Sequence, residues 1–218
     1  MNKKNTILNN LQAGLAYYNL HASTEQQEKI CEFLFTLEKW SKVHNLTAIT
    51  KVEEMLTKHV LDSLAVTSFI SHGNILDVGT GAGLPGLPLA IIKPDIHFVL
   101  LDSNRKKTAF VQHVITQVGL TNITVVHTRV ENYKPPVLFD VIVSRAFAEL
   151  GEFITSCSQL CHKDGFFIAM KGKVQQAKRE SLPYGYLLTK IETITVPGLL
   201  EERCLVFVRK QNEEKLSE

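Results

Sequence analysis

One segment of the 218-residue chain combines residue types that could bind a nucleotide-like cofactor. It reads Asp77-Val78-Gly79-Thr80-Gly81-Ala82-Gly83-Leu84-Pro85-Gly86 and follows a short apolar run. Glycines at such a turn let the backbone bend sharply and let a ligand approach with no Cβ in the way. A turn with three spaced glycines but no ligand would cost conformational entropy with little packing gain. We therefore expect a cofactor-binding loop here.

The glycines fit two cofactor patterns, which use different members of the loop. Gly81, Gly83 and Gly86 match the G-x-G-x-x-G fingerprint of dinucleotide-binding proteins, and Asp102 lies at roughly the expected 20-residue offset. Gly79, Gly81 and Gly83 match the D-x-G-x-G-x-G loop of S-adenosylmethionine enzymes. Both cofactors carry an adenosine, and Asp102 could accept hydrogen bonds from the ribose hydroxyls of either.

The charge of Asp77 and the end of the chain favour the second pattern. A carboxylate would repel a pyrophosphate, whereas it would attract the ammonium group of a methionine moiety. The β-rich runs 186–196 and 204–208 predict a terminal hairpin, with which methyltransferase sheets end. A dinucleotide fold would instead have six parallel strands. We expect an S-adenosylmethionine-dependent methyltransferase, with an NAD-dependent oxidoreductase as the alternative.

The elements that must position this loop alternate between strand and helix patterns. Short apolar runs predict strands at 75–78, 97–101, 123–126, 141–143 and 166–170, and helix-like segments lie between them at 85–93, 104–118 and 148–162. Such alternation predicts a parallel sheet covered on both faces. With the hairpin, we expect an α/β, Rossmann-like class I methyltransferase fold, with a mostly parallel seven-stranded sheet and a terminal antiparallel hairpin.

The first 70 residues have helical patterns only. Ser23 and Thr24 can each cap a helix, with Gln26 and Gln27 three residues further on. The apolar stripe after them, which includes Trp40, has helical spacing, so we expect Trp40 in the core rather than stacked on a nucleobase. A further helix fits 52–70.

These patterns divide the chain into three parts. We expect an N-terminal helical extension over 1–72, packed on a Rossmann-like core over 73–210. The residues 211–218 are polar, so we expect a frayed tail.

Composition restricts the class of protein. Hydrophobic residues make up 44% and charged residues 21%, and the net charge is +2, which excludes collagen-like, disordered and disulfide-scaffold proteins. The four cysteines lack metal-site spacing, and Cys157 and Cys161 should pack as small apolar residues on one helix. Neither a signal-peptide core nor an apolar run of about 18 residues is present. We expect a cytoplasmic monomer with no metal and no membrane contact.

Further motifs give the chain a specific resemblance. They are Trp40-x-x-x-His44-Asn45-Leu46-Thr47, His59-x-x-Asp62-Ser63-Leu64, the glycine loop through Gly86, Leu101-Asp102-Ser103, Arg129-Val130-Glu131, Ser144-Arg145-Ala146-Phe147, Lys171-Gly172 and Glu202-Arg203. Over most of its length the chain resembles the RsmG (GidB) family, the bacterial 16S ribosomal RNA guanine-N7 methyltransferases. The Ser-Arg-Ala-Phe and Gly-Leu-Pro-Gly stretches are the most selective. His44 stands where the family has tyrosine, which leaves the local role of that position open.

The resemblance implies a cofactor, a site and a substrate. It implies cofactor contacts at Gly79, Leu84, Val130, Glu131 and Arg145. Together with the motif's other residues, the candidate S-adenosylmethionine site is Asp77, Gly79, Gly81, Gly83, Leu84, Asp102, Val130, Glu131 and Arg145. The implied substrate is a guanine in the 530 loop of 16S ribosomal RNA within the 30S subunit.

The residues constrain the methyl acceptor mainly by what they lack. Methylation of pyrimidine carbon 5 generally needs a cysteine nucleophile, and none follows the fourth or fifth expected strand. The Asn/Asp-Pro-Pro-aromatic motif of exocyclic-amine enzymes is replaced by Ser144-Arg145-Ala146-Phe147. Guanine N7 has a lone pair and no proton to lose, so alignment of donor and acceptor would suffice. We therefore assign no catalytic base. The resemblance places Arg145 at the cofactor and so implies a positioning role for it.

Basic residues after strands two to five favour an RNA acceptor. That edge of the sheet is the ligand edge in this fold, and cationic side chains there would meet phosphates. The side chains with candidate RNA contacts are Arg105, Arg129, Phe147, Lys171, Lys173 and Arg203. Because the major groove of duplex RNA is too deep to reach N7, the target should lie in a loop or be flipped out.

The sequence leaves two alternative functions and the placement of one group of residues open. A methyltransferase acting on a small molecule or a protein would carry the same cofactor loop, and a non-enzymatic ribosome-assembly factor would bind the same RNA. His59, Asp62 and Ser63 could face the site, but we expect them to form a hydrogen-bond network on a helix surface.

Overall fold

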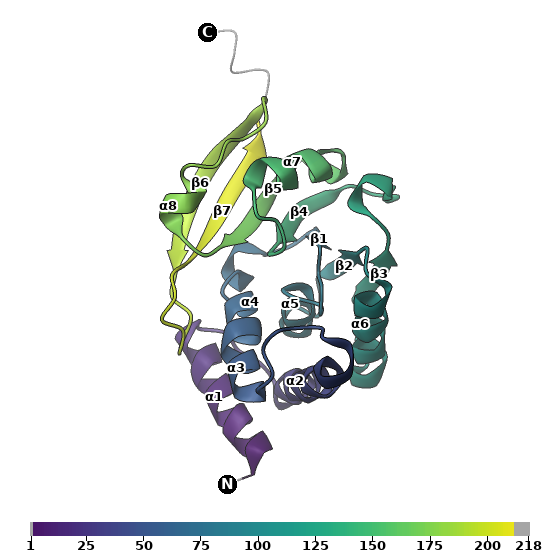
Figure 1. Ribbon diagram of the computed structural model, residues 1–218, viewed down its shortest axis with the longest axis vertical. Helices are drawn as coiled ribbons and strands as arrows, with labels where there is room; N and C mark the ends of the chain where they lie inside the picture. The colour runs from purple at the N-terminus through teal and green to yellow at the C-terminus, as the bar shows by residue number, and fades with distance from the viewer. Residues whose placement is uncertain (1, 212–218) are drawn as a thin grey trace.

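The protein is built around one twisted sheet of seven strands (Figure 1). The computed structural model describes residues 2–211, so the predicted polar tail lies outside the described residues apart from Gln211. The strands are β1 (Asn74–Val78), β2 (His97–Asp102), β3 (Ile123–His127), β4 (Phe139–Ser144), β5 (Cys161–Lys171), β6 (Tyr186–Ile194) and β7 (Arg203–Lys210). Their order across the sheet is β3-β2-β1-β4-β5-β7-β6.

The pairing of these strands confirms the predicted fold class. Strands β1 to β5 pair in parallel, and β7 runs antiparallel to both β5 and β6. The strand order reverses beside β1, where β2 and β4 flank it. A crevice outside the carboxyl ends of the strands at such a point is where open α/β sheets bind ligands. The glycine loop follows β1 and therefore lies at that crevice.

Helices cover both faces of the sheet. The helices after the first strand are α5 (Gly86–Ile92), α6 (Arg105–Val118), α7 (Leu150–Cys157) and α8 (Val174–Ala177), with single turns η3 (Val130–Asn132) and η4 (Ser158–Leu160). Buried residues of α5 and α6 belong to one apolar cluster, and those of α7 and α8 belong to the cluster on the opposite face. The core is therefore two layers separated by the sheet.

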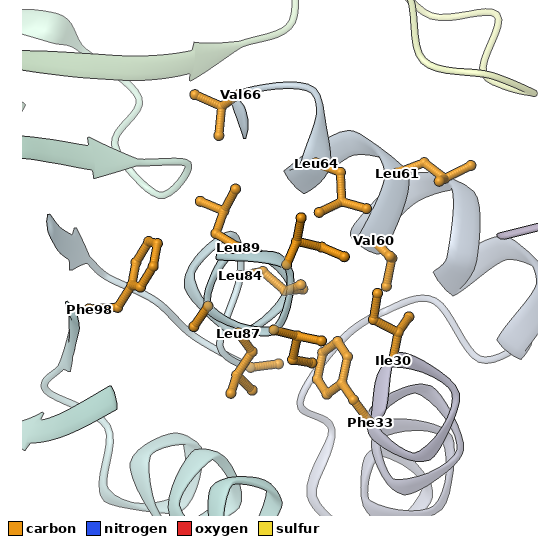
Figure 2. Packing of buried hydrophobic residues seen from close by; sticks show 14 of the residues in the cluster. Ile30, Phe33, Val60, Leu61, Leu64, Val66, Leu84, Leu87, Leu89 and Phe98 are labelled. Carbon is orange, nitrogen blue, oxygen red and sulfur yellow. The ribbon is translucent and has the colours of Figure 1, made fainter. Parts of the chain in front are cut away.

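The N-terminal segment adds helices to the α5 face. They are α1 (Lys3–Tyr17), α2 (Thr24–His44), α3 (Val52–Met55), η1 (Leu56–Leu61), α4 (Asp62–Leu64) and η2 (Thr67–Phe69). Figure 2 shows Ile30 and Phe33 of α2, and Val60 of η1, pointing toward Leu84 and Leu87. The predicted cap is confirmed, because the Ser23 hydroxyl accepts from the Gln26 N–H in a capping box. Trp40 packs against this cluster, as predicted.

Two predicted helices differ from the structure. The helix expected over 52–70 is interrupted, because Leu56–Leu61 forms a wider π-helical turn. The helix expected over 148–162 ends at Cys157, and Cys161 instead begins β5 by pairing with Phe139. The shared helix for Cys157 and Cys161 was therefore wrong. The polar residues that open β5 hide its strand pattern, and pairing with β4 determines it.

The described residues bear on the expectations about membranes and metals. Within residues 2–211, no helix has the length and apolar character needed to cross a membrane. The same residues contain no group of three or more His, Cys, Asp or Glu side chains arranged to hold a metal ion.

Candidate cofactor and acceptor site

The glycine loop is closed by the carboxylate at the end of β1. Asp77 is fully buried, and its Oδ2 accepts hydrogen bonds from the Thr80 hydroxyl at 2.6 Å and from the Gly86 N–H at 2.8 Å. Burial raises the pKa of the Asp77 carboxyl to about 6, although these two bonds oppose the shift. Its Oδ1 is buried and has no hydrogen-bond partner among the described residues. Asp77 thus lies under the glycine loop, and its two hydrogen bonds connect Thr80 at the start of the loop to Gly86 at its end.

The backbone of the loop requires glycine at the predicted positions. Gly79, Gly81 and Gly83 have φ values of +69°, +59° and +83°, which L-residues rarely adopt. A Cβ at Gly79 would lie 2.7 Å from the Cβ of Ala146. A Cβ at Gly81 would make only ordinary contacts, with the Gly79 carbonyl oxygen at 3.9 Å and the Lys107 Nζ at 4.0 Å. The loop therefore leaves its backbone free of side chains at Gly79 and Gly81, which is the fit that a bound cofactor requires.

The carboxylate at the end of β2 is tied to this loop. Asp102 is buried; its Oδ2 accepts from the Gly81 N–H at 2.8 Å and its Oδ1 from the Asn104 N–H at 2.7 Å. Asn104 in turn caps α6. The two predicted acidic residues, Asp77 and Asp102, therefore hold the glycine loop from both sides.

Three neighbouring cavities lie along the carboxyl edge of the sheet. The first, about 410 Å³, is bordered by Gly79, Asp102, Val130, Glu131 and Phe147 among others. The structure thus brings together predicted cofactor residues from the ends of three strands. Its size is within the range of small-molecule sites, and its acidic and backbone groups suit a ribose and a base.

A second, smaller cavity of about 200 Å³ continues along the glycine loop. It is bordered by Gly79, Gly81, Leu84, Lys107 and Arg145, and so it shares Gly79 and Lys107 with the first cavity. The third cavity, about 420 Å³, shares Arg145 with the second and is also bordered by Lys171 and Arg203. Arg145 therefore borders both the cavity along the glycine loop and the third cavity.

The third cavity contains a buried charge cluster. The Asp62 carboxylate is only 3% exposed; its Oδ2 lies 3.2 Å from the Arg145 Nη1 and its Oδ1 lies 3.2 Å from the Arg203 Nε. The Arg145 Nη1 also donates to the carbonyl of Lys58 at 3.3 Å. The prediction of a surface network for His59, Asp62 and Ser63 was wrong, because all three are buried. The widened turn Leu56–Leu61 and the start of α4 face this site.

The histidine beside this cluster is neutral near pH 7. Burial, with the nearby Arg145 charge, lowers the pKa of His59 to about 4. Its Nδ1 lies 3.1 Å from the carbonyl of Lys58 and must donate to it, so Nε2 accepts from the Thr47 hydroxyl at 2.8 Å. Both ring nitrogens are therefore engaged.

The predicted RNA-contacting residues fall into different environments. The Lys171 ammonium donates to the Glu180 carboxylate at 2.9 Å and to the carbonyls of Phe147 and Ala148, so it holds the loop after β4. Phe147 packs on Phe153 with ring centroids 5.3 Å apart and borders the first cavity.

The other basic candidates differ in whether they border a cavity. Arg203 borders the third cavity and Arg129 the first. Arg105 and Lys173 are exposed and border none of the three cavities.

Sequence reasoning missed several residues that the structure brings to the site. Thr80 donates to Asp77, Thr47 donates to His59, and Lys107 borders two cavities. Thr80 lies inside the glycine loop and Thr47 inside a motif of the resemblance, so the motifs could have indicated that both residues lie near the site. Lys107 follows the second strand and is one of several basic residues there, so its type and position did not single it out.

Known proteins similar to this chain are methyltransferases. A family model described as rRNA small subunit methyltransferase G matches residues 26–206. A curated relative named ribosomal RNA small subunit methyltransferase G, from Nitrosococcus oceani, is 45% identical over 201 residues, which cover 92% of this chain and 94% of the relative. The protein of the same name from Legionella pneumophila is 43% identical over 204 residues, which cover 94% and 95%.

Solved structures agree on the fold. TrmN from Thermus thermophilus superposes with a TM-score of 0.55 at 18% identity, over 69% of this chain and 48% of that one. M. jannaschii TYW2, solved in complex with AdoMet, gives 0.52 at 13% identity, over 69% and 76%. At these identities the likeness concerns the fold, and it confirms the class I methyltransferase architecture.

These relatives decide between the two interpretations of the glycine loop. The matching family is one of methyltransferases, so the expected methyl donor, S-adenosylmethionine, is confirmed and the nicotinamide alternative is set aside. The match extends from α2 to β7 and includes the glycine loop and all three cavities. The chain therefore belongs to the rRNA small subunit methyltransferase G family.

Proposed function

We propose that this protein transfers a methyl group from S-adenosylmethionine to N7 of a guanine in the 530 loop of 16S ribosomal RNA, within the 30S subunit. The family name supports small-subunit ribosomal RNA as the substrate. The resemblance of the motifs supports the guanine, its N7 atom and the 530 loop. S-adenosylmethionine supplies a methyl group that is activated on a sulfonium.

One observation about the third cavity carries the choice of acceptor atom. Among the described residues that border it, the only carboxylate belongs to Asp62, and both of its oxygens already accept from arginine side chains. The imidazole of His59 has both nitrogens engaged. No side chain there is free to take a proton, so the site suits a nucleophile that has none to lose. A purine N7, with an in-plane lone pair, is such a nucleophile.

The linings of the three cavities support a separate role for each in binding the cofactor and the acceptor. Asp102, Val130 and Glu131 border the first cavity and would hold the adenosine. The glycine loop borders the second and would hold the methionine part, whereas Arg145, which borders both the second and the third cavity, would face the acceptor. The third cavity would admit the base, and catalysis would come from alignment rather than proton transfer. Because 30S subunits are cytoplasmic, this substrate would place the enzyme in the cytoplasm. We propose that it acts there as a monomer.

A transfer assay tests this proposal. Labelled S-adenosylmethionine is incubated with 30S subunits from cells that lack the enzyme, with naked 16S RNA beside them, and the nucleosides are identified by mass spectrometry. We expect label in 7-methylguanosine at one loop position. Asp102→Ala should abolish transfer, whereas Asp95→Ala, at an exposed turn before β2, should not.

Each contrary result has a distinct meaning. Label in another nucleoside would refute N7 as the acceptor atom. Measurable cofactor binding without label in RNA would refute an RNA substrate and point to a small-molecule or protein acceptor. Subunit binding that needs no cofactor, with no transfer to any acceptor, would indicate an assembly factor.

A further inference from the structure

A single buried carboxylate connects three separate parts of the chain at the third cavity. Asp62 belongs to the N-terminal helices, Arg145 follows β4, and Arg203 begins β7. Both ion pairs measure 3.2 Å, and each arginine side chain is about three-quarters covered, with 25% and 26% exposed. All three residues border the same cavity. The carboxylate therefore bridges two guanidinium groups at the wall where the acceptor would enter.

The helix that carries Asp62 is anchored from its other side. In Figure 2, Val60 and Leu64 point into the apolar cluster toward α5 and α2, and all of their surface except about 1% is buried. The π-helical turn Leu56–Leu61 precedes Asp62, and such turns occur frequently at functional sites. Its Lys58 carbonyl accepts a further bond from Arg145 at 3.3 Å. Asp62 is thus a rigid anchor.

The two arginines keep donors that the protein does not use. Arg145 engages the protein through Nη1 only, and Arg203 through Nε and Nη1, among the described residues. Each guanidinium carries five N–H donors in a fixed plane. With Asp62 holding one edge, the remaining N–H groups are fixed in direction. Without it, the two positive charges would repel each other and both side chains would gain rotational freedom.

We infer that Asp62 is a positioning residue of the acceptor site: it holds Arg145 and Arg203 so that their remaining N–H groups bind acceptor oxygens of the target nucleotide. The oxygen is guanine O6 or a phosphate oxygen, since both match a guanidinium. The inference rests on the proposed function and adds the group that organises recognition of its RNA substrate.

The first test measures the effect of removing the charge of Asp62. Asp62→Asn should lower kcat/KM for 30S subunits by about 10- to 100-fold, the range for loss of charge-assisted hydrogen bonds. The affinity for S-adenosylmethionine, measured by calorimetry, should stay unchanged. Asp95→Asn makes the same chemical change at an exposed position and should match the wild type.

A second variant separates positioning from a merely structural role. Arg203→Lys removes the planar fork, and the Asp62→Asn/Arg203→Lys double variant should transfer no more slowly than the slower single variant. Such non-additivity is expected when one residue acts through the other. If the two losses multiply, or if Asp62→Asn transfers at the wild-type rate, the inference is overturned.

A modified substrate then identifies the oxygen. Subunits are reconstituted with 2-aminopurine at the target position, which keeps N7 but lacks O6. If O6 is bound, the wild-type rate falls and Asp62→Asn causes no further loss. If a phosphate is bound, Asp62→Asn causes the same fold-loss on both substrates. Both results support the inference, because in each case the arginine N–H groups bind an acceptor oxygen of the target nucleotide.

The tests of the inference and of the proposed function can fail separately. If the wild-type enzyme labels a nucleoside other than 7-methylguanosine, the proposed function fails. The comparison of Asp62→Asn with Asp95→Asn on that nucleoside still decides the inference. An equal loss of cofactor affinity in Asp62→Asn would overturn the inference even if 7-methylguanosine is the product.

Discussion

At the level of single residues, the glycine loop combines a strained backbone conformation with close contacts on one side. Gly79 has φ +69° and would place a Cβ 2.7 Å from that of Ala146, which follows β4. Gly119 ends α6 with a similar φ of +65°, and a Cβ there would meet nothing within 4 Å. The two glycines share the backbone strain and differ in their surroundings, which makes them a matched pair for mutation.

Substitution of these glycines should separate strain from cofactor binding. Gly119→Ala should lower the free energy of unfolding by about 1–2 kcal/mol, the cost of a left-handed backbone for an L-residue. Gly79→Ala should lower it by at least as much, because its Cβ also meets that of Ala146. Only Gly79→Ala should weaken S-adenosylmethionine binding, because its methyl group pushes the loop away from Ala146 at the cavity wall. Urea unfolding and calorimetric titration measure the two quantities. Equal cofactor affinities in both variants would contradict this assignment.

The buried carboxylate of Asp77 predicts a pH dependence. Burial raises its pKa from the ordinary 3.8 to about 6, so the folded protein binds this proton more tightly than the unfolded chain does. The stabilisation from protonated Asp77 is complete below about pH 4 and is lost as pH rises toward 6. The free energy of unfolding of the wild type, minus that of Asp77→Asn, should therefore fall across this range by about 3 kcal/mol at most.

Urea unfolding of both proteins between pH 4 and pH 7.5 measures this difference. Because other titrating groups are common to both proteins, their contributions cancel in the subtraction. A difference that stays flat, or that rises with pH, would show that the folded protein does not raise the pKa of Asp77.

At the level of elements, one side chain connects the start of α2 to the end of α5. The Gln26 Oε1 accepts from the Ser23 N–H at 2.8 Å, which completes the capping box. Its Nε2 donates to the carbonyls of Ile91 at 2.8 Å and Ile92 at 3.3 Å, in the last turn of α5. Since α5 follows the glycine loop directly, this contact helps to hold the loop's helix against α2.

Loss of this side chain should cost more than loss of its neighbour. Gln26→Ala should lower the free energy of unfolding by about 1–2 kcal/mol, because it removes the side-chain half of the capping box and leaves helix carbonyls without a donor. Gln27→Ala is the control, since among the described residues the Gln27 side chain donates to the nearby carbonyl of Ala22 and makes no hydrogen bond to α5. Chemical denaturation of both variants gives the comparison. Equal destabilisation would mean that the contact with α5 contributes nothing.

At the level of the whole molecule, the N-terminal helices form a layer of the core. Ile7 and Leu11 of α1, and Ile30 and Phe33 of α2, belong to the same buried cluster as residues of α5 and the sheet. The segment also supplies Asp62 to the third cavity. We propose that the extension over 1–72 and the core over 73–210 fold as one cooperative unit.

A truncated chain tests this proposal. A protein that begins at residue 73 would expose the apolar face that α2 and the following turns cover, so it should not unfold cooperatively and should aggregate. Circular dichroism during thermal unfolding, together with size-exclusion chromatography, measures both properties. A soluble truncated chain with a cooperative transition and S-adenosylmethionine binding would show that the core is an independent domain.

The parts of this structure that the sequence predicted are those set by neighbouring residues. Short apolar runs ending in glycines or in an acid located β1 and β2, and the Ser23 and Gln26 pair located the start of α2. The spaced glycines of the loop predicted a sharply bent backbone there. Local signals failed where pairing overrode them, as in the polar residues 162–164 that open β5.

Tertiary structure alone decided how the acceptor end of the site is built. Asp62 lies 83 residues from Arg145 and 141 residues from Arg203, and no spacing rule connects residues so far apart. Their meeting depends on β7 running antiparallel beside β5 and on the π-helical turn that precedes Asp62. Likewise, Lys171 contacts Glu180 because the chain folds back after β5. The sequence by itself determined the fold class and the cofactor loop, because both depend on short-range periodicity and backbone geometry. The partners of the basic side chains depend on which strands pair and which helix faces pack, and only the folded chain settles these.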